Sequence, residues 1–161
     1  IITVSLRFGE YAWAENFIFE YIEYLPANIR ENARIFNLAN LYSHQKKHTQ
    51  VIELLRNVEY SDVVYSLGSK VILVRTYYDL GEYLALESLI DSFRIYLRRN
   101  KVLSKNLKRE YNNFLNLVKK LTTIDTRNPK EIAMIRKRVA AVSYATPKRW
   151  LNEKIKDIEE K

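Results

Sequence analysis

The sequence predicts an all-α fold built as a stack of antiparallel helical hairpins. Only three glycines and three prolines occur in 161 residues, too few for the turns of a sheet-rich fold. Apolar side chains recur at helical spacing along most of the chain. The third observation is internal similarity: Gly9-Glu10-Tyr11 recurs 72 residues later as Gly81-Glu82-Tyr83, with Gln45-Lys46-Lys47 midway. A unit of 36 residues follows, a length typical of helical repeats.

Apolar positions follow the same 36-residue spacing. The aligned sets are Leu6, Tyr42 and Tyr78, then Ile18, Leu54 and Ile90, and finally Phe17 and Leu89, where Glu53 interrupts the middle copy. Because a single hairpin cannot bury its apolar face alone, this register predicts that neighbouring hairpins pack on one another.

Helical periodicity and terminal signals define the individual elements. The predicted helices span residues 11–24, 28–44, a segment around 51–55, and then about 62–80, 83–99, 105–121, 129–142 and 147–158. Short polar side chains satisfy the free amides of a first turn, so several N-caps are expected. The expected caps are Ser61 or Asp62, Ser104, Asn128 (followed by Pro129 and Glu131) and Thr146.

The helix over residues 11–24 carries a stripe of apolar side chains at helical spacing, namely Trp13, Phe17, Ile18, Tyr21 and Tyr24. Aromatic residues next to basic ones can stack on nucleic-acid bases. Packing between hairpins is the favoured interpretation, because tyrosine has a large apolar body and a polar tip. The tyrosines expected to be buried or half-buried are Tyr21, Tyr24, Tyr77, Tyr78, Tyr83 and Tyr111.

Residues 1–121 are expected to form the hairpins, and residues 122–161 a polar linker with capping helices of the same domain. With Gly9 in an interhelix turn, residues 1–8 correspond to only the second half of a first helix. The chain starts with isoleucine rather than methionine. We therefore expect it to be the C-terminal part of a longer repeat protein.

The hairpin unit resembles the tetratricopeptide repeat. The resemblance lies in Leu80-Gly81-Glu82-Tyr83 with Tyr77 before it, and in Arg7 to Tyr11, followed by Ala14 and Pro26. The middle copy departs from the family pattern, with Gln45 for the glycine, Lys47 for the aromatic residue and Gln50 for the small residue. Residues 85–99 are also similar to the C-terminal region of repeat proteins that have no assigned function.

This resemblance implies a right-handed solenoid whose first helices line a concave groove for an extended peptide or a partner helix. Transferred by register, the groove residues are Asn32, Ala39, Tyr42, Arg75 and Tyr78. The primary hypothesis is therefore a non-enzymatic protein-binding or scaffolding module with an unidentified protein or peptide partner. A structural spacer without a partner is a further alternative.

Charge is unevenly distributed and raises a competing hypothesis. Residues 1–92 contain eight basic and twelve acidic side chains, whereas residues 93–161 contain 19 basic and seven acidic ones. Basic side chains at this density can attract nucleic acid, an anionic membrane or an acidic partner. A solvated surface that complements helix C-termini and keeps the protein soluble is the favoured interpretation. The basic surface consists of Arg98, Arg99, Lys101, Lys105, Lys108, Arg136, Lys137 and Arg138.

No pattern in the sequence predicts an active site, a metal or a cofactor. His44 and His48 have zinc-like spacing but lie beside an expected turn without a third ligand. The carboxylate pairs Glu20/Glu23, Asp79/Glu82 and Glu87/Asp91 are expected in solvent rather than in the buried site that acid–base catalysis usually needs. The absence of cysteine favours a reducing compartment such as the cytoplasm. The longest aliphatic run, residues 71–74, is too short to span a membrane.

Overall fold

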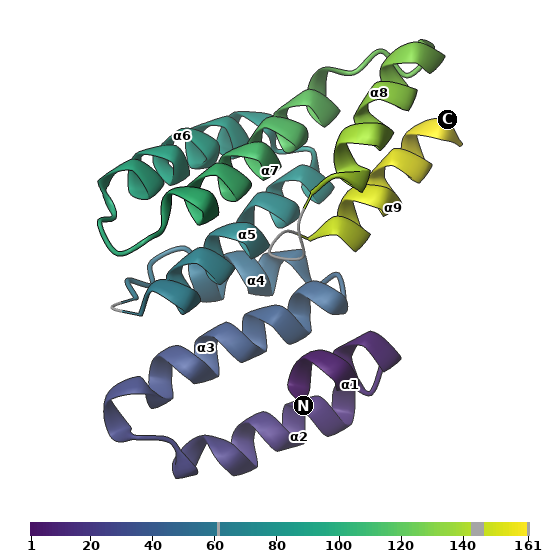
Figure 1. Ribbon diagram of the computed structural model, residues 1–161. Helices are drawn as coiled ribbons and strands as arrows, with labels where there is room; N and C mark the ends of the chain where they lie inside the picture. The colour runs from purple at the N-terminus through teal and green to yellow at the C-terminus, as the bar shows by residue number, and fades with distance from the viewer. Residues whose placement is uncertain (61, 143–146, 161) are drawn as a thin grey trace. The chain divides into compact units, whose positions relative to one another are not determined.

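A computed structural model describes residues 1–60, 62–142 and 147–160 of the chain (Figure 1). Within these residues every regular element is a helix and no strand occurs, so the all-α prediction is confirmed. The elements are α1 (Ile2–Phe8), α2 (Tyr11–Tyr21), the 3₁₀ helix η1 (Ile22–Tyr24), α3 (Ala27–His44), α4 (His48–Leu55), α5 (Val63–Leu80), α6 (Tyr83–Arg99), α7 (Lys105–Thr123), α8 (Pro129–Ala140) and α9 (Lys148–Glu159). They form two compact units, Ile1–Glu82 and Tyr83–Lys161.

In the first unit α3 is the central helix and contacts α1, α2, α4 and α5 (Figure 1). Two groups of buried residues lie along it. The first contains Leu6, Ala14, Ile18, Leu38 and Leu41, and the second contains Ala39, Val51, Leu55 and Ile72. Because α3 contributes to both groups, it joins the α1–α2 pair to α4 and α5.

Three interhelix turns, which follow α1, α3 and α5, share one backbone geometry. Each contains a residue with positive φ: Gly9 at 79°, Lys46 at 57° and Gly81 at 72°. In each turn the next amide donates to the carbonyl five residues earlier, as in the bond from Glu10 to Ser5 at 3.0 Å. Such a bond satisfies a carbonyl that the helix end leaves free. The predicted turns are present, but the left-handed residue of the middle one is Lys46 rather than Gln45.

Gln45 instead keeps right-handed angles (φ −79°, ψ 0°) and extends the end of α3 by one residue. The three left-handed residues are therefore 37 and 35 positions apart rather than 36 and 36. This shift realigns the helices that follow the turns. The buried sets become Ala14, Val51 and Leu86, and then Ile18, Leu55 and Ile90. In this alignment Leu54, rather than Glu53, is the position equivalent to Phe17 and Leu89. The apolar set that Glu53 interrupted in the sequence alignment is therefore complete.

Three of the predicted N-caps are confirmed, whereas α9 begins at Lys148 with Pro147 in the N-cap position rather than in the first helical position. Asp62 accepts hydrogen bonds from the amides of Val64 and Tyr65 at 2.8 and 3.0 Å. Ser104 and Asn128 cap α7 and α8 in the same way. Ser61 and Thr146, the other candidates, lie outside the described residues. The segment at 22–24 was predicted as the end of an α-helix but forms the 3₁₀ turn η1.

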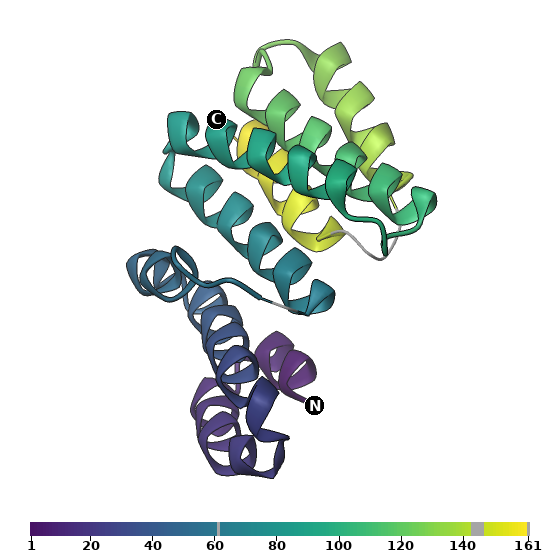
Figure 2. The same cartoon turned by 90° about the vertical axis from the view of Figure 1, so that its left-hand side faces the viewer.

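The second unit contains two helix pairs, α6 with α7 and α8 with α9, and α7 contacts all three of the others (Figure 2). Phe93 and Phe114 are fully buried, and the ring of Phe114 meets Trp150 of α9 edge-on at 6.5 Å. The segment predicted as a linker joins α7 to α8 within this unit. There Glu131 pairs with Lys120 at 3.2 Å and accepts a bond from the amide of Asp125.

Candidate functional site

Four of the five predicted groove residues are partly exposed and one is not. Asn32 and Tyr42 lie on α3, and Arg75 and Tyr78 lie on α5, all with intermediate exposure. Ala39 is fully buried among α3, α4 and α5 and cannot contact a partner, so its assignment to the groove was wrong. The register did not reveal that Ala39 faces Val51 and Leu55 of α4 and Ile72 of α5.

Tyr42 is a structural residue as well as a groove candidate. Its side chain packs against both buried groups of the first unit. The ammonium group of Lys47 lies 5.3 Å from the centre of its ring, within range of a cation–π contact. Nearby, the hydroxyl of Tyr11 donates to the carbonyl of His44 at 3.4 Å and links the start of α2 to the end of α3.

An aromatic ladder, defined here as Trp13, Phe17, Tyr21 and Tyr24, runs along α2 and η1. Successive ring centres are 5.0, 4.3 and 5.7 Å apart. Trp13 and Tyr21 are each 46% exposed and Tyr24 is 81% exposed. The prediction that Tyr21 and Tyr24 pack between hairpins was therefore wrong. Ala14 and Ile18, on another side of α2, make the contacts with the core.

The other four tyrosines that were expected to be buried or half-buried also differ in their exposure. Tyr77, Tyr78 and Tyr111 are half-buried, as predicted, whereas Tyr83 is 47% exposed. Tyr111 packs against the ring of Phe93 at 5.7 Å, and burial raises the pKa of its hydroxyl. Periodicity locates such residues on a helix but does not tell which of its faces is covered.

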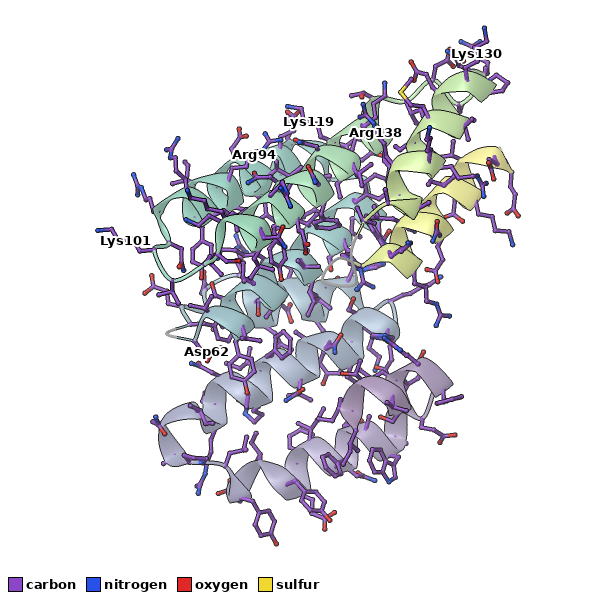
Figure 3. All side chains as sticks on the ribbon, viewed as in Figure 1. Asp62, Arg94, Lys101, Lys119, Lys130 and Arg138 are labelled. Atoms are coloured by element: carbon purple, nitrogen blue, oxygen red, sulfur yellow. The ribbon has the colours of Figure 1, made fainter. Side chains whose placement is uncertain are left out.

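The predicted basic surface divides into two groups within the second unit. Five residues surround the loop between α6 and α7, namely Arg98, Arg99, Lys101, Lys105 and Lys108. The other three, Arg136, Lys137 and Arg138, lie on α8. Figure 3 shows Lys101 at one end of this unit and Lys130 at the other, with Arg94, Lys119 and Arg138 between them. The eight residues thus do not form one compact cluster.

Most of this basic surface is free of ion pairs. Arg136 pairs with Glu159, whereas no ion pair is found for the other seven within the described part of the chain. The loop that carries Lys101 is shaped by Asn100, whose side-chain oxygen Oδ1 accepts hydrogen bonds from the backbone amides of Val102 and Leu103. Unpaired cations on an ordered loop are available to an anionic partner.

A hollow of about 430 Å³ lies between α7 and α8. It is lined by Arg109, Glu110, Asn113, Asn116, Leu117, Arg138, Ala141 and Val142. Arg94 of α6 donates to the side-chain oxygen of Asn116 at 2.8 Å. Sequence reasoning missed Arg109, Asn113 and Asn116, although their spacing of four and then three residues placed them on one face of α7.

The remaining candidates for a metal or catalytic site are the two histidines and the three carboxylate pairs. Nδ1 of His44 donates to the carbonyl of Asn40 at 2.9 Å, and Nδ1 of His48 is buried without a hydrogen-bond partner among the residues that the structure describes. Over the described ranges, no group of three or more His, Cys, Asp or Glu residues is placed to hold a metal. The three carboxylate pairs are all exposed. No helix among the described residues has the length and apolar character needed to cross a bilayer.

Comparison of the chain with models of protein families, with curated proteins and with solved structures gives no match.

Proposed function

We propose that the chain is a non-enzymatic protein-binding module of tetratricopeptide-repeat-like hairpins, which holds an extended peptide or partner helix against its first helices. The observation that carries this proposal is the repeated turn geometry at Gly9, Lys46 and Gly81. In a hairpin repeat, α1, α3 and α5 would be the first helices of three successive hairpins, because each precedes one of these turns. In support, α3 contacts both α1 and α5. A right-handed solenoid with a concave face is the arrangement that such a series favours.

The surface proposed for the partner consists of Asn32 and Tyr42 on α3 with Arg75 and Tyr78 on α5. Tyrosine offers rigid contact area, and arginine offers a planar donor fork that suits carboxylates and backbone carbonyls. Both helices belong to the same compact unit and contact one another. Contributions from two adjoining helices give a peptide several anchor points, which is how hairpin repeats achieve affinity.

A peptide-display selection on the immobilised chain tests this proposal. We expect enriched peptides that lose binding at least tenfold in the double variant Asn32→Arg with Arg75→Gln. Tyr42 is left intact because its side chain packs in the core, so truncation would also unfold the unit. Arg56 and Asn57 are exposed residues of the same unit, and Arg56→Gln with Asn57→Arg is the matched control.

The control should bind like the wild type, and both variants should show unchanged circular dichroism. Absence of enriched peptides would favour the structural-spacer hypothesis. Peptides that bind both double variants equally would show that the surface lies elsewhere.

Nucleic-acid binding is the second candidate, and the unpaired cations around the α6–α7 loop favour it. Each phosphate contact releases counterions, so affinity for a short duplex or single strand should fall steeply between 50 and about 200 mM salt. Filter binding of the wild type against Arg98→Glu with Lys101→Glu tests it. Absence of binding at low salt would exclude this candidate.

A further inference from the structure

The aromatic ladder on α2 is not required for the core of the first unit. Ala14 and Ile18 fill the contact of α2 with α1 and α3, and both are buried. Trp13, Tyr21 and Tyr24 leave a large part of their rings in water. A row of four adjoining rings, three of them exposed, differs from single exposed apolar residues, which are common, and indicates a contact surface.

The rings also support one another. Trp13 and Phe17 are stacked with an angle of 24° between their planes, and Phe17 and Tyr21 with 21°. Tyr24 continues the row at a tilt of 36° from Tyr21. Mutual stacking restricts the rotamers of each ring before any partner arrives, so a partner that binds here pays little for ordering them.

Carboxylates accompany the ladder. Residues 10–24 contain four glutamates and no lysine or arginine. Glu20 follows Phe17 by three residues within α2, so it lies on the same side of that helix as Phe17. Glu10 stands three residues before Trp13 and makes no capping bond, and neither Glu10 nor Glu20 has an ion pair within the described residues. Glu23 is paired with Arg30 at 2.7 Å.

We propose that the aromatic ladder is a docking surface for a lysine- or arginine-rich segment of a partner protein. Ring faces attract ammonium and guanidinium groups, and the adjacent carboxylates of Glu10 and Glu20 add charge attraction. The same carboxylates repel phosphates, which argues against stacked nucleic-acid bases on these rings. The surface is separate from the residues of the proposed groove on α3 and α5, so the two proposals stand independently.

Trp13 provides a direct readout. The chain has two tryptophans, and the other, Trp150, is buried in the second unit. The variant Trp150→Phe leaves Trp13 as the only tryptophan of the chain. Circular dichroism first checks that this variant is folded. We expect octa-arginine to change the emission of Trp13 saturably, with a half-saturation concentration that rises with salt. Octa-glutamate and a neutral peptide of the same length should have no effect.

Substitutions assign the effect to the ladder. In the Trp150→Phe background, Tyr24→Ala and Glu20→Gln should each weaken octa-arginine binding about two- to fivefold, as expected for exposed cation–π and charge contacts. Phe19 belongs to the same helix and is 52% exposed but makes no ring contact with the ladder within the described residues. Phe19→Ala is therefore the matched control and should bind octa-arginine like its parent.

Several results would overturn this proposal. One is a Trp13 response to the neutral peptide, or to vesicles of a neutral phospholipid, as large as that to octa-arginine. Another is no response to octa-arginine at low salt, or equal weakening by Phe19→Ala and Tyr24→Ala. A third is a Trp13 signal that depends on protein concentration alone, with dimers in sedimentation, because the occupant would then be a second copy of the chain.

Discussion

Gly68 of α5 lies directly against the ring of Phe36 of α3. A β carbon at residue 68 would stand 2.6 Å from Cε2 of that ring and 2.9 Å from Cζ. The ring is also held from another side by Tyr65, whose ring centre is 5.2 Å away. An added β carbon at residue 68 would therefore force the ring of Phe36 to shift, and glycine avoids this because the two helices approach closely here.

We expect Gly68→Ala to destabilise the first unit by about 1–2 kcal/mol. Overpacking costs about 1–3 kcal/mol, and the better helix propensity of alanine recovers up to about 1 kcal/mol. Urea denaturation followed by circular dichroism measures the difference. In a Phe36→Ala background the same change should instead stabilise the unit by up to about 1 kcal/mol, because the obstructing ring is gone and only the helix propensity of alanine remains. Equal costs in both backgrounds would contradict the contact.

We expect Lys46→Gly to stabilise the chain by about 1 kcal/mol, because a side chain in the left-handed region is strained. Gln45 has right-handed angles, so Gln45→Gly should instead cost about 0.5–1 kcal/mol. Thermal unfolding of the two variants distinguishes the register of the structure from the 36-residue spacing. Stabilisation by Gln45→Gly and not by Lys46→Gly would instead support the regular 36-residue spacing, with residue 45 in the left-handed conformation.

Replacing Asp62 by alanine should cost about 1 kcal/mol, since the amides of Val64 and Tyr65 lose their acceptor. Glu10 occupies the N-cap position of α2 without a side-chain cap bond, which makes Glu10→Ala a suitable control. That control should change the free energy of unfolding by less than about 0.5 kcal/mol. A similar loss in both variants would indicate a general effect of negative charge at helix starts.

Lys70 of α5 is half-buried, and burial lowers the pKa of its ammonium group. The unfolded chain then binds more protons than the folded chain between the lowered pKa and the unfolded value near ~10.4. Stability should therefore rise with pH across that window. The free energy of unfolding of the wild type minus that of Lys70→Met should increase from neutral pH towards pH ~10. A constant difference would show that Lys70 titrates alike in both states.

Local signals in the sequence predicted most of the elements. Asp62, Ser104 and Asn128 cap the helices that follow them, because each places a short oxygen beside free amides. The middle turn escaped prediction at the level of one residue. Neither Gln45 nor Lys46 is a glycine, so nothing local marks which of them takes the left-handed angles that Lys46 has.

Exposure was harder to predict than helix position. A helical stripe such as Trp13 to Tyr24 has the periodicity of a core face, yet smaller residues of α2 make the core contacts. Ala39 illustrates the reverse, since its register suggested a groove but α4 and α5 cover it. Which face a neighbour covers depends on interhelix contacts that one sequence does not specify. The hollow lined by Arg109 and Arg138 also lies between two helices, α7 and α8, whose contact was not predicted.

The position of α3 in both buried groups has a mechanical consequence. Tension applied at residue 1 would first peel α1 and α2 away from one side of α3, while its contacts with α4 and α5 still hold. The amides of α3 should consequently be the slowest of the first unit to exchange with deuterium, and those of α1 among the fastest. Tyr42, which touches both groups, would be the last common contact to break.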